Sequence, residues 1–254
     1  MFDVLYVLRN DINNAPDELI HSVRSVAQNF PYRKLVFCGG CPDALTPDIY
    51  IPHQQLGATK WERAGSSLKK ALSDERLTDN VWLFNDDFYV LNKLQPCFST
   101  NYSSGTLEKR IREMRGRFPN SSQYIRNLET MRTALIRLNK DTLCFALHMP
   151  MLINRRDFLQ MLEEHPQSIK YFRSFYGNLY KIPCEFVEKD CKIYTNDELP
   201  DTFQYLSTTD GSYKEGKVGE FIRQYFPTPS RYEKAGIPVP DVHELFTEEG
   251  DHDF

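Results

Sequence analysis

Apolar residues along the chain form short buried runs that alternate with longer segments of helical spacing. The first run, DVLYVLR (3–9), is typical of a strand and leads into a polar loop. Residues 18–30 (ELIHSVRSVAQNF) then place Leu19, Val23 and Val26 on one face of a helix. The pattern predicts that the chain begins with a strand, a loop and a helix.

The same alternation continues as far as residue 91. The segments RKLVFCG (33–39) and PDIYIP (47–52) favour short strands, and WERAGSSLKKALSDERL (61–77) favours a helix. The next segment, VWLFNDDFYVL (81–91), reads as a strand that three polar residues interrupt at its middle. Strands that alternate with helices predict an α/β fold with a mostly parallel sheet flanked by helices.

The pattern changes after Pro96. A polar passage leads to a helical region from residue 107 to about 138, interrupted near Pro119, and we interpret about 103–140 as a helical insert. TLCFAL (142–147) then predicts a strand, followed by a loop at His148 and another helix.

The last residues carry a different composition. Residues 227–254 combine prolines and charges with few core candidates, so we expect them to wrap the surface or to fray. The predicted organisation is one α/β domain over 1–226, with the insert inside it and a C-terminal tail over 227–254.

Composition supports a globular chain. Hydrophobic residues make up 41% of the 254 residues, which is enough for one large α/β domain. The net charge of -4 gives no global reason to expect nucleic-acid or membrane binding. A signal-peptide pattern and a long apolar span are both absent from the sequence, so the prediction is a soluble, cytoplasmic protein.

The cysteines offer one motif, CGGC, formed by Cys38 and Cys41 around two glycines. Such a pair can be a redox centre or half of a zinc site, but no neighbouring CxxC or histidine pair completes a zinc set. The glycines also suit a turn after the strand KLVFC, and we favour that interpretation together with reduced thiols.

The polar interruption Asn85-Asp86-Asp87 carries the strongest chemical signal. It follows the apolar run VWLF, and ligands bind at the carboxyl ends of strands in open α/β sheets. Adjacent carboxylates near a core need a cation or hydrogen bonds, and carboxylate oxygens select Mg²⁺ or Mn²⁺, which also bind phosphates. Strand geometry would point Asn85 and Asp87 at one ligand and Asp86 away. The alternative is a solvated loop or an Asx turn.

Two further loops contribute candidates. His148 follows the predicted strand LCFAL as the acidic triplet follows its own, so it is a candidate metal ligand or general base, with a packing role as the alternative. Arg9, Asp11 and Asn13 follow the first strand; Arg9 suits a phosphate or base carbonyl and Asp11 suits ribose hydroxyls, with surface capping as the rival. Arg173 and further basic residues are candidates for neutralising a diphosphate; they include Lys217 and Arg223.

Several segments together resemble the glycosyltransferase-like group that includes the Stealth capsular-polysaccharide sugar-phosphate transferases and small bacterial and phage relatives. The segments that carry this resemblance are DVLYVLRND with ELIHSVRSV, KWERAGSSLKKAL, LFNDDFYV, HMPMLINRRDFL, RSFYGN and STTDGSYKEGKVGEFIRQYFPTPSRYE. The opening has Arg9-Asn10-Asp11 where many Stealth members have an Asp-Gly-Ser-like pattern, which leaves the donor nucleotide open.

The resemblance implies a GT-A-like catalytic domain that binds a nucleotide-diphosphate sugar. In it Asn85 and Asp87 would match the metal-binding motif, His148 the histidine of the HxP segment, and Arg173 the basic residue near the sugar phosphates.

The resulting hypothesis is a glycosyltransferase that uses Mn²⁺ or Mg²⁺ and a nucleotide-diphosphate sugar, with a UDP-sugar favoured. Asp87, Asp86 and His148 would hold the metal, and Asp87, His148 and Asp210 would serve the reaction. The nucleotide and diphosphate contacts would come from Arg9, Asp11, Asn13, Lys60, Asn85, Asp86, Arg173 and Lys217, with Arg173, Asp210 and Lys217 toward the sugar or acceptor.

Alternatives remain open for the chemistry and the acceptor. Transfer of a sugar phosphate, metal-dependent phosphodiester hydrolysis and a non-catalytic binding protein are the other functions considered. The acceptor is a glycan or, in a phage relative, a modified base in DNA. A basic helix face would contact DNA phosphates, although such clusters are usually solvated; it comprises Lys109, Arg110, Arg112, Arg115 and Arg117.

Overall fold

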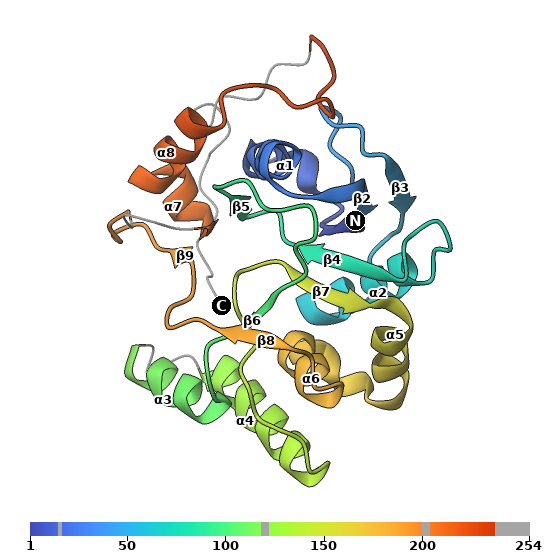
Figure 1. Ribbon diagram of the computed structural model, residues 1–254, viewed down its shortest axis with the longest axis vertical. Coiled ribbons are helices and arrows are strands. Elements are labelled where there is room, and N and C mark those ends of the chain that lie inside the picture. The colour runs from blue at the N-terminus through green and yellow to red at the C-terminus, as the bar shows by residue number, and fades with distance from the viewer. Residues whose placement is uncertain (15–16, 118–121, 200–203, 237–254) are drawn as a thin grey trace.

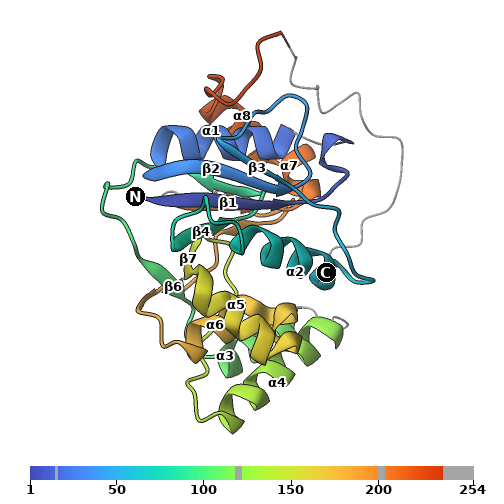
Figure 2. The same cartoon turned by 90° about the vertical axis from the view of Figure 1, so that its right-hand side faces the viewer.

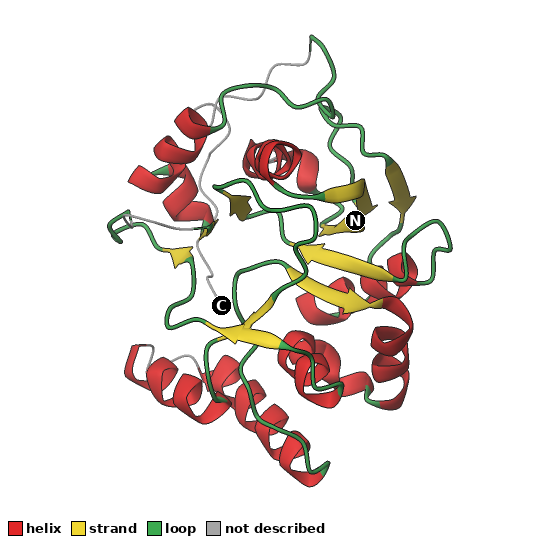
Figure 3. Ribbon diagram, viewed as in Figure 1, coloured by secondary structure: helices red, strands yellow, loops and turns green. Residues whose placement is uncertain are grey.

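The computed structural model describes residues 1–14, 17–117, 122–199 and 204–236. Figure 1 shows a central sheet with helices around it, and Figure 3 separates the strands from the helices by colour. The sheet has the order β3-β2-β1-β4-β7, and β7 alone among these strands is antiparallel to its neighbour. The predicted mostly parallel α/β sheet is therefore confirmed. The strands are β1 (Phe2–Leu8), β2 (Tyr32–Gly39), β3 (Ile49–Pro52), β4 (Asn80–Phe84) and β7 (Met151–Asn154).

Successive residues of β1 point to opposite faces of the sheet, and each face carries its own core. Val4 and Tyr6 pack on α1 (Asp17–Asn29), while Leu5 belongs to the core on the side of α2 (Lys60–Leu72). Figure 2 shows α1 and α2 on opposite faces of the strands. The apolar run is therefore buried on both faces, as expected of a parallel strand.

The predicted helical insert contains two helices that lie at one end of the molecule in both views (Figures 1 and 2). The interruption predicted near Pro119 lies outside the described residues. The elements on this side are α3 (Leu107–Arg117), α4 (Ser122–Arg137), α5 (Arg155–Glu164), the 3-10 helix η2 (Pro166–Tyr171), α6 (Phe172–Leu179) and the pair β6 (Asn101–Ser103) and β8 (Cys184–Phe186).

Directly after β4, the chain leaves the main sheet and enters a second, smaller sheet. Its central strand pairs antiparallel with β5 and parallel with β9, and Phe88 lies opposite Ser207. The predicted single interrupted strand 81–91 is therefore divided between two sheets. The elements are β5 (Phe88–Val90), β9 (Lys192–Ile193), β10 (Tyr205–Thr208), α7 (Asp210–Lys214) and α8 (Lys217–Tyr225), with the short 3-10 helix η1 (Ile12–Asn14) after β1.

The strand predicted over 142–147 is wrong. This apolar segment makes only an isolated bridge, between Leu143 and Thr106. Cys144 bonds to the backbone on that side: its N–H donates to the carbonyl oxygen of Gly105 at 2.7 Å, and its C=O accepts from the N–H of Ser104 at 3.0 Å. Side chains of α6 bond the alternate residues: Asn178 bonds both the N–H and the C=O of Leu143 at 2.8 Å, and Ser174 Oγ accepts from the N–H of Phe145 at 2.9 Å. The sheet continues later, at β7.

Two other local expectations have clear outcomes. At CGGC, Gly39 has φ +98°, and a Cβ there would lie 2.2 Å from the carbonyl oxygen of Leu8. The glycines therefore permit close approach of two strand ends, and the described cysteines are all free thiols, as the turn interpretation requires. Among the residues after 226, for which few core residues are expected, Tyr232 is buried and donates to Asp48 Oδ2 at 2.8 Å. Residues 237–254 lie outside the described part.

Candidate functional site

The carboxyl ends of β1 and β4 meet at the centre of the main sheet, where the strand order changes direction. Strands β2 and β3 lie on one side of β1, and β4 lies on the other. In open α/β sheets such a switch point forms the crevice that binds ligands. The loop that contains Arg9 and the triplet Asn85–Asp87 both begin at this crevice.

The triplet Asn85–Asp87 forms a turn in which the N–H of Phe88 donates to the carbonyl oxygen of Asn85 at 3.3 Å. The strand geometry expected for Asn85 and Asp87 is therefore wrong, because the chain leaves one sheet and enters the other within these residues. Asn85 is exposed, whereas Asp86 and Asp87 are half-buried.

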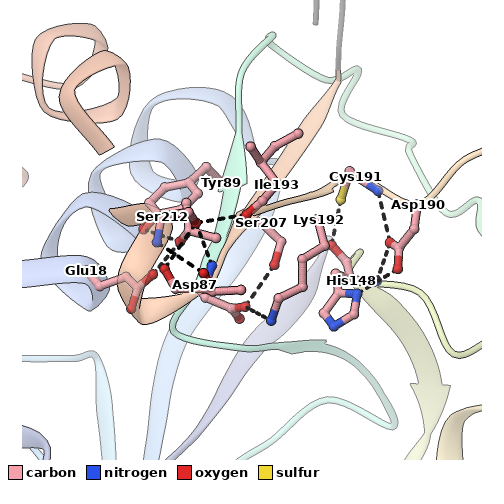
Figure 4. A network of polar contacts seen from close by, with 12 residues as sticks. Glu18, Asp87, Tyr89, His148, Asp190, Cys191, Lys192, Ile193, Ser207 and Ser212 are labelled. Carbon is pink, nitrogen blue, oxygen red and sulfur yellow. Dashed lines mark hydrogen bonds and ion pairs between the residues drawn. The ribbon is translucent and has the colours of Figure 1, made fainter. Parts of the chain in front are cut away.

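Asp87 is held on the side of the second sheet (Figure 4). Its Oδ2 accepts from Ser207 Oγ at 2.8 Å and lies 3.7 Å from Lys192 Nζ. Its other oxygen, Oδ1, is buried and has no hydrogen-bond partner among the described residues. Asp87 thus offers one oxygen fixed by the protein and one oxygen in need of a donor or a cation.

Glu18, in the first turn of α1, adds a third carboxyl group behind the turn. Thr208 donates its hydroxyl to Glu18. Burial raises the pKa of Glu18 well above its usual value, and the charges of Asp87 and Asp86 raise it further. Both effects favour the protonated form of Glu18, which limits the negative charge of the cluster.

Burial and the neighbouring acidic groups also raise the pKa of Asp86. Burial and the charge of Asp87 raise its pKa to about 6, while Arg9 acts in the opposite direction. Its ionised form therefore lacks sufficient compensation within the protein.

His148 lies beside this turn but faces a different carboxylate. Its Nδ1 is 2.7 Å from Asp190 Oδ2, and its ring meets the ring of Phe88 edge to face at a centroid distance of 6.4 Å. The loop at His148 does approach the acidic turn, as predicted, although no strand precedes it. The described residues contain no group of three histidine, cysteine or acidic side chains arranged to hold a metal ion. His148 is therefore not brought into a metal set with Asp86 and Asp87.

Arg173, on α6, supplies a cation between these groups. Its guanidinium lies 5.4 Å from the Phe88 ring and donates to the carbonyl oxygen of Met149 at 2.6 Å. Burial lowers the pKa of Arg173 to about 10, against the opposing effect of Asp87 and Asp190. It remains charged at neutral pH, close to the acidic turn.

A cavity of about 370 Å³ opens on the α2 side of the turn. Asn85, Asp86, Asn127 and Tyr171 are among the residues that line it. Asn127 Nδ2 and the Tyr171 hydroxyl are buried polar atoms with no hydrogen-bond partner among the described residues. Aromatic and basic side chains form part of the wall, among them Trp61, Tyr124, Phe172, Lys170 and Arg173. Aliphatic side chains form much of the rest, including those of Val7, Leu68, Leu83, Leu128 and Ile169, so the cavity has an apolar wall with a few polar groups, as ligand pockets commonly have.

The other predicted residues around the first strand differ in their surroundings. Arg9 and Asp11 form an exposed ion pair at 3.4 Å at the mouth of the crevice. Asn13 accepts from the N–H of Asp43 at 2.9 Å, so its side chain also holds a loop. Lys60 begins α2, and its Nζ lies 5.4 Å from the ring of Trp61 in the cavity wall.

Of the two C-terminal candidates, Asp210 lies near the acidic turn and Lys217 does not. Asp210 begins α7, and its charge contributes to the raised pKa of both Asp86 and Glu18, which places it near the turn. Lys217 is exposed and pairs with Glu198 at 3.5 Å, so the structure does not bring it to the acidic residues. Arg223 donates to the carbonyl oxygen of Tyr213 at 2.9 Å and stabilises the packing of α7 and α8.

Sequence reasoning missed Glu18, Asp190, Lys192 and Ser207. A glutamate in the first turn of a helix is common because its negative charge is favourable at the helix N-terminus, so Glu18 could not be recognised from the sequence as a site residue. Asp190 and Lys192 lie in the short charged string EKDCK, whose contacts depend entirely on long-range folding.

The chemistry of the turn fits a divalent cation. Asp87 Oδ1 is a buried oxygen without a partner among the described residues, and Asp86 carries an undercompensated charge beside it. Mg²⁺ and Mn²⁺ are commonly held by one or two carboxylates, with waters and substrate phosphates as the remaining ligands.

The mostly parallel sheet, its flanking helices and its strand-end crevice define a GT-A-like fold. A solved structure of the galactosyltransferase LgtC, in complex with donor and acceptor sugar analogues, matches with a TM-score of 0.54 over 93% of this chain and 97% of that chain, at 11% identity. A structure of an active-site mutant of LgtC matches at 12% identity over 68% of this chain and 65% of that chain, with a TM-score of 0.41.

The likeness to LgtC is one of fold. No family model and no curated protein sequence matches the chain. The Stealth resemblance therefore stays a prediction. Within the described residues, no helix has the length and apolar character that crossing a bilayer requires.

Proposed function

We propose that the protein is a metal-dependent glycosyltransferase that moves a sugar from a nucleotide-diphosphate sugar to an acceptor. The observation that carries this proposal is the acidic turn Asn85–Asp87 at the switch point of a GT-A-like sheet, beside a cavity with unpaired polar groups. LgtC, which shares the fold, was solved with donor and acceptor sugar analogues, and this supports the same class of substrate here.

Asp87 and Asp86 would hold Mn²⁺ or Mg²⁺ together with oxygens of the donor diphosphate. Bound there, the ion would supply positive charge to the leaving nucleoside diphosphate. Arg173 supports the same task from the protein itself, because its guanidinium stays charged beside the turn.

The donor would lie across the crevice. Arg9, Asp11 and Asn13 follow β1 and are assigned to the nucleotide, for which we favour uridine, and Lys60 would approach the same molecule from α2. The sugar ring would enter the cavity, where Asn127 Nδ2 and the Tyr171 hydroxyl would gain partners in sugar hydroxyls. Lys217 has no role in this arrangement.

The charge pattern of the helical insert favours a glycan acceptor over DNA. Lys109 lies near Glu113, Arg112 near Glu108, and Arg115 pairs with Glu129. Arg110 turns inward to Asp190 at 3.8 Å. This face is a set of ion pairs rather than a basic stripe, so we expect little salt-dependent binding to duplex DNA.

Transfer of a whole sugar and transfer of a sugar phosphate can be distinguished by the nucleotide that each reaction releases. Whole-sugar transfer releases a nucleoside diphosphate, whereas transfer of a sugar phosphate releases a nucleoside monophosphate, so the released nucleotide distinguishes them. Two-metal phosphodiester hydrolysis needs further metal ligands beside Asp86 and Asp87, and the described residues provide no such set.

Release of nucleoside diphosphate from a panel of nucleotide sugars tests the proposal. We expect release to require Mn²⁺ or Mg²⁺ and to be lost in Asp87→Asn. A matched control is Asp79→Asn, because Asp79 is exposed and precedes β4, at the strand end opposite the turn. Equal loss in both variants, or release without a metal, would contradict the assignment.

A further inference from the structure

A second ordered cluster lies beside the acidic turn and centres on His148 and Asp190 (Figure 4). Asp190 Oδ2 is 2.7 Å from His148 Nδ1, and Asp190 Oδ1 accepts from the backbone N–H of His148 at 2.9 Å. The same Oδ1 accepts from the N–H of Cys191 at 2.9 Å. One carboxylate therefore fixes both the ring and the backbone of a single histidine.

Other contacts make this arrangement rigid. Cys191 donates its thiol to the carbonyl oxygen of His148 at 2.8 Å, which closes a ring of bonds between the two loops. Arg110, on α3 of the helical insert, lies 3.8 Å from Asp190 Oδ2. Burial disfavours the Asp190 carboxylate, but the charge and hydrogen bonds of His148 outweigh it and lower its pKa below the usual value. Asp190 is therefore ionised at neutral pH.

An ionised carboxylate only accepts hydrogen bonds, so His148 Nδ1 carries a proton. In the neutral imidazole the other nitrogen, Nε2, is then an acceptor. Among the described residues Nε2 has no hydrogen-bond partner, and the His148 side chain is 32% exposed. Its ring contacts that of Phe88, the residue directly after Asp87, which places His148 beside the acidic turn.

We propose that Asp190 is a positioning residue of the transfer reaction, which holds His148 with Nδ1 protonated so that Nε2 takes the proton of the acceptor hydroxyl. This inference rests on the proposed function. As the acceptor oxygen bonds to the anomeric carbon, its proton passes to His148 Nε2. The bond from the anomeric carbon to the diphosphate breaks, and its electron pair leaves with the nucleoside diphosphate.

Arg110 links the helical insert to the pair formed by Asp190 and His148. Its side chain is 18% exposed, unlike the strongly exposed Arg112 and Arg115 on the same helix. Because its guanidinium lies near Asp190 Oδ2, its positive charge helps to lower the pKa of Asp190 and so favours the ionised carboxylate. The insert thus supports the orientation of a reacting group.

Nitrogen NMR of the uniformly ¹⁵N-labelled full chain tests the tautomer without a substrate. His148→Gln identifies the His148 signals by their loss. At a pH where the ring is neutral, we expect the wild type to show a protonated Nδ1 and an unprotonated Nε2. In Asp190→Asn the amide offers a donor to Nδ1, so the tautomer with protonated Nε2 should gain population, and Asp190→Glu should restore the wild-type pattern.

Steady-state kinetics with the donor provides the second readout. We expect Asp190→Asn to lower kcat at least about tenfold with the donor KM nearly unchanged, since the residue acts on proton transfer rather than on donor binding. Glu188→Gln, an exposed neighbour on the same loop, serves as the matched control and should change neither the spectrum nor kcat.

Three outcomes overturn the inference. Protonation of His148 on Nε2 in the wild type would exclude the tautomer, even if Asp190→Asn cannot be folded. Unchanged nitrogen shifts in a folded Asp190→Asn, or a wild-type kcat in that variant, would exclude the positioning role. Failure of the wild type to turn over any nucleotide sugar, with the expected tautomer present, would instead refute the proposed function and the proton transfer with it.

Discussion

The two sides of the Asn85–Asp87 turn are built in contrasting ways. Toward α1 and the second sheet, Asp87 is engaged by Ser207 and Lys192, and Glu18 is buried against Thr208. Toward α2 and α4, the turn faces a cavity in which Asn127 Nδ2 and the Tyr171 hydroxyl are unpaired among the described residues. The first side fixes the Asp87 carboxylate through Oδ2 and leaves its charged Oδ1 without a partner among the described residues, whereas the second leaves neutral polar groups unsatisfied.

This difference indicates which side exchanges ligand. Unpaired buried polar groups cost free energy in a folded protein, so they persist where a ligand pairs with them or where function requires them. A fixed carboxylate network, in contrast, serves to hold one charged group in place. We therefore assign the metal and diphosphate to the fixed side and the sugar to the cavity.

The largest expected effect is at Asp87. Asp87→Asn keeps an oxygen for Ser207 but removes the charge, so transfer should fall roughly 100-fold or more if this side holds the metal and the leaving group. The melting temperature should change little, because relief of the repulsion with Asp86 offsets the lost ion pair with Lys192. Transfer assays and thermal unfolding check both parts, and retained activity would refute the assignment of charge to this side.

The next effect is the pH dependence of metal binding. Asp86 has a pKa of about 6, raised by burial and by Asp87, and only its ionised form binds a cation. Mn²⁺ affinity should therefore fall by about tenfold per pH unit below 6 and level off above about 7.

The sign for stability is opposite to that for metal binding. A raised pKa in the folded state means that ionisation of Asp86 costs stability, so the metal-free protein should lose stability as the pH rises from about 4 through 6. Asp86→Asn should remove both dependences. A flat titration of Mn²⁺ affinity in the wild type would contradict the role of Asp86.

A third prediction concerns the cavity. Asn127→Leu keeps a similar branched shape and removes the unpaired Nδ2 together with the hydrogen bond that Oδ1 accepts from Gln123 at 2.9 Å. The two losses offset one another, so the stability of the free protein should change little, while donor affinity should fall about tenfold. Ser168→Ala is the matched control, since Ser168 Oγ is also buried and unpaired among the described residues but does not line the cavity. Calorimetric donor affinity should be unchanged in that control; equal loss in both would show that the cavity is not the sugar site.

The smallest effect is expected at the exposed pair Arg9 and Asp11. Because both side chains are more than half exposed, Asp11→Ala should change the free energy of unfolding by less than about 0.5 kcal/mol. Affinity for the free nucleoside diphosphate should fall only a few-fold. A larger loss of stability would indicate that this pair serves the fold rather than the nucleotide.

The sequence predicted the main sheet well because its strands are buried on both faces, which leaves a periodicity signal at residues such as Val4, Leu5 and Tyr6. It failed at 142–147, whose backbone bonds to a loop at Gly105 on one side and to the side chains of Asn178 and Ser174 on the other. Apolar content gives no indication of whether a strand or a side chain will satisfy a buried backbone.

In the candidate site too, the sequence identified some residues from a local pattern and missed others whose contacts are long-range. Asn85, Asp86 and Asp87 stand out because polar residues interrupt an apolar run. Asp190 and Ser207 do not, since their meaning depends on contacts with His148 and Asp87 across 42 and 120 residues of sequence. Local pattern thus identifies where a strand ends, and long-range folding decides which partners meet there.

Titration calorimetry of the wild type with a panel of nucleotide-diphosphate sugars, with and without Mn²⁺, tests the central claim most directly. The account predicts that the wild type binds a nucleotide sugar, with a UDP-sugar favoured, and that Mn²⁺ strengthens this binding. In Asp87→Asn, both the binding and its dependence on Mn²⁺ should be lost. Absence of binding to every nucleotide sugar, with the metal present, would contradict it.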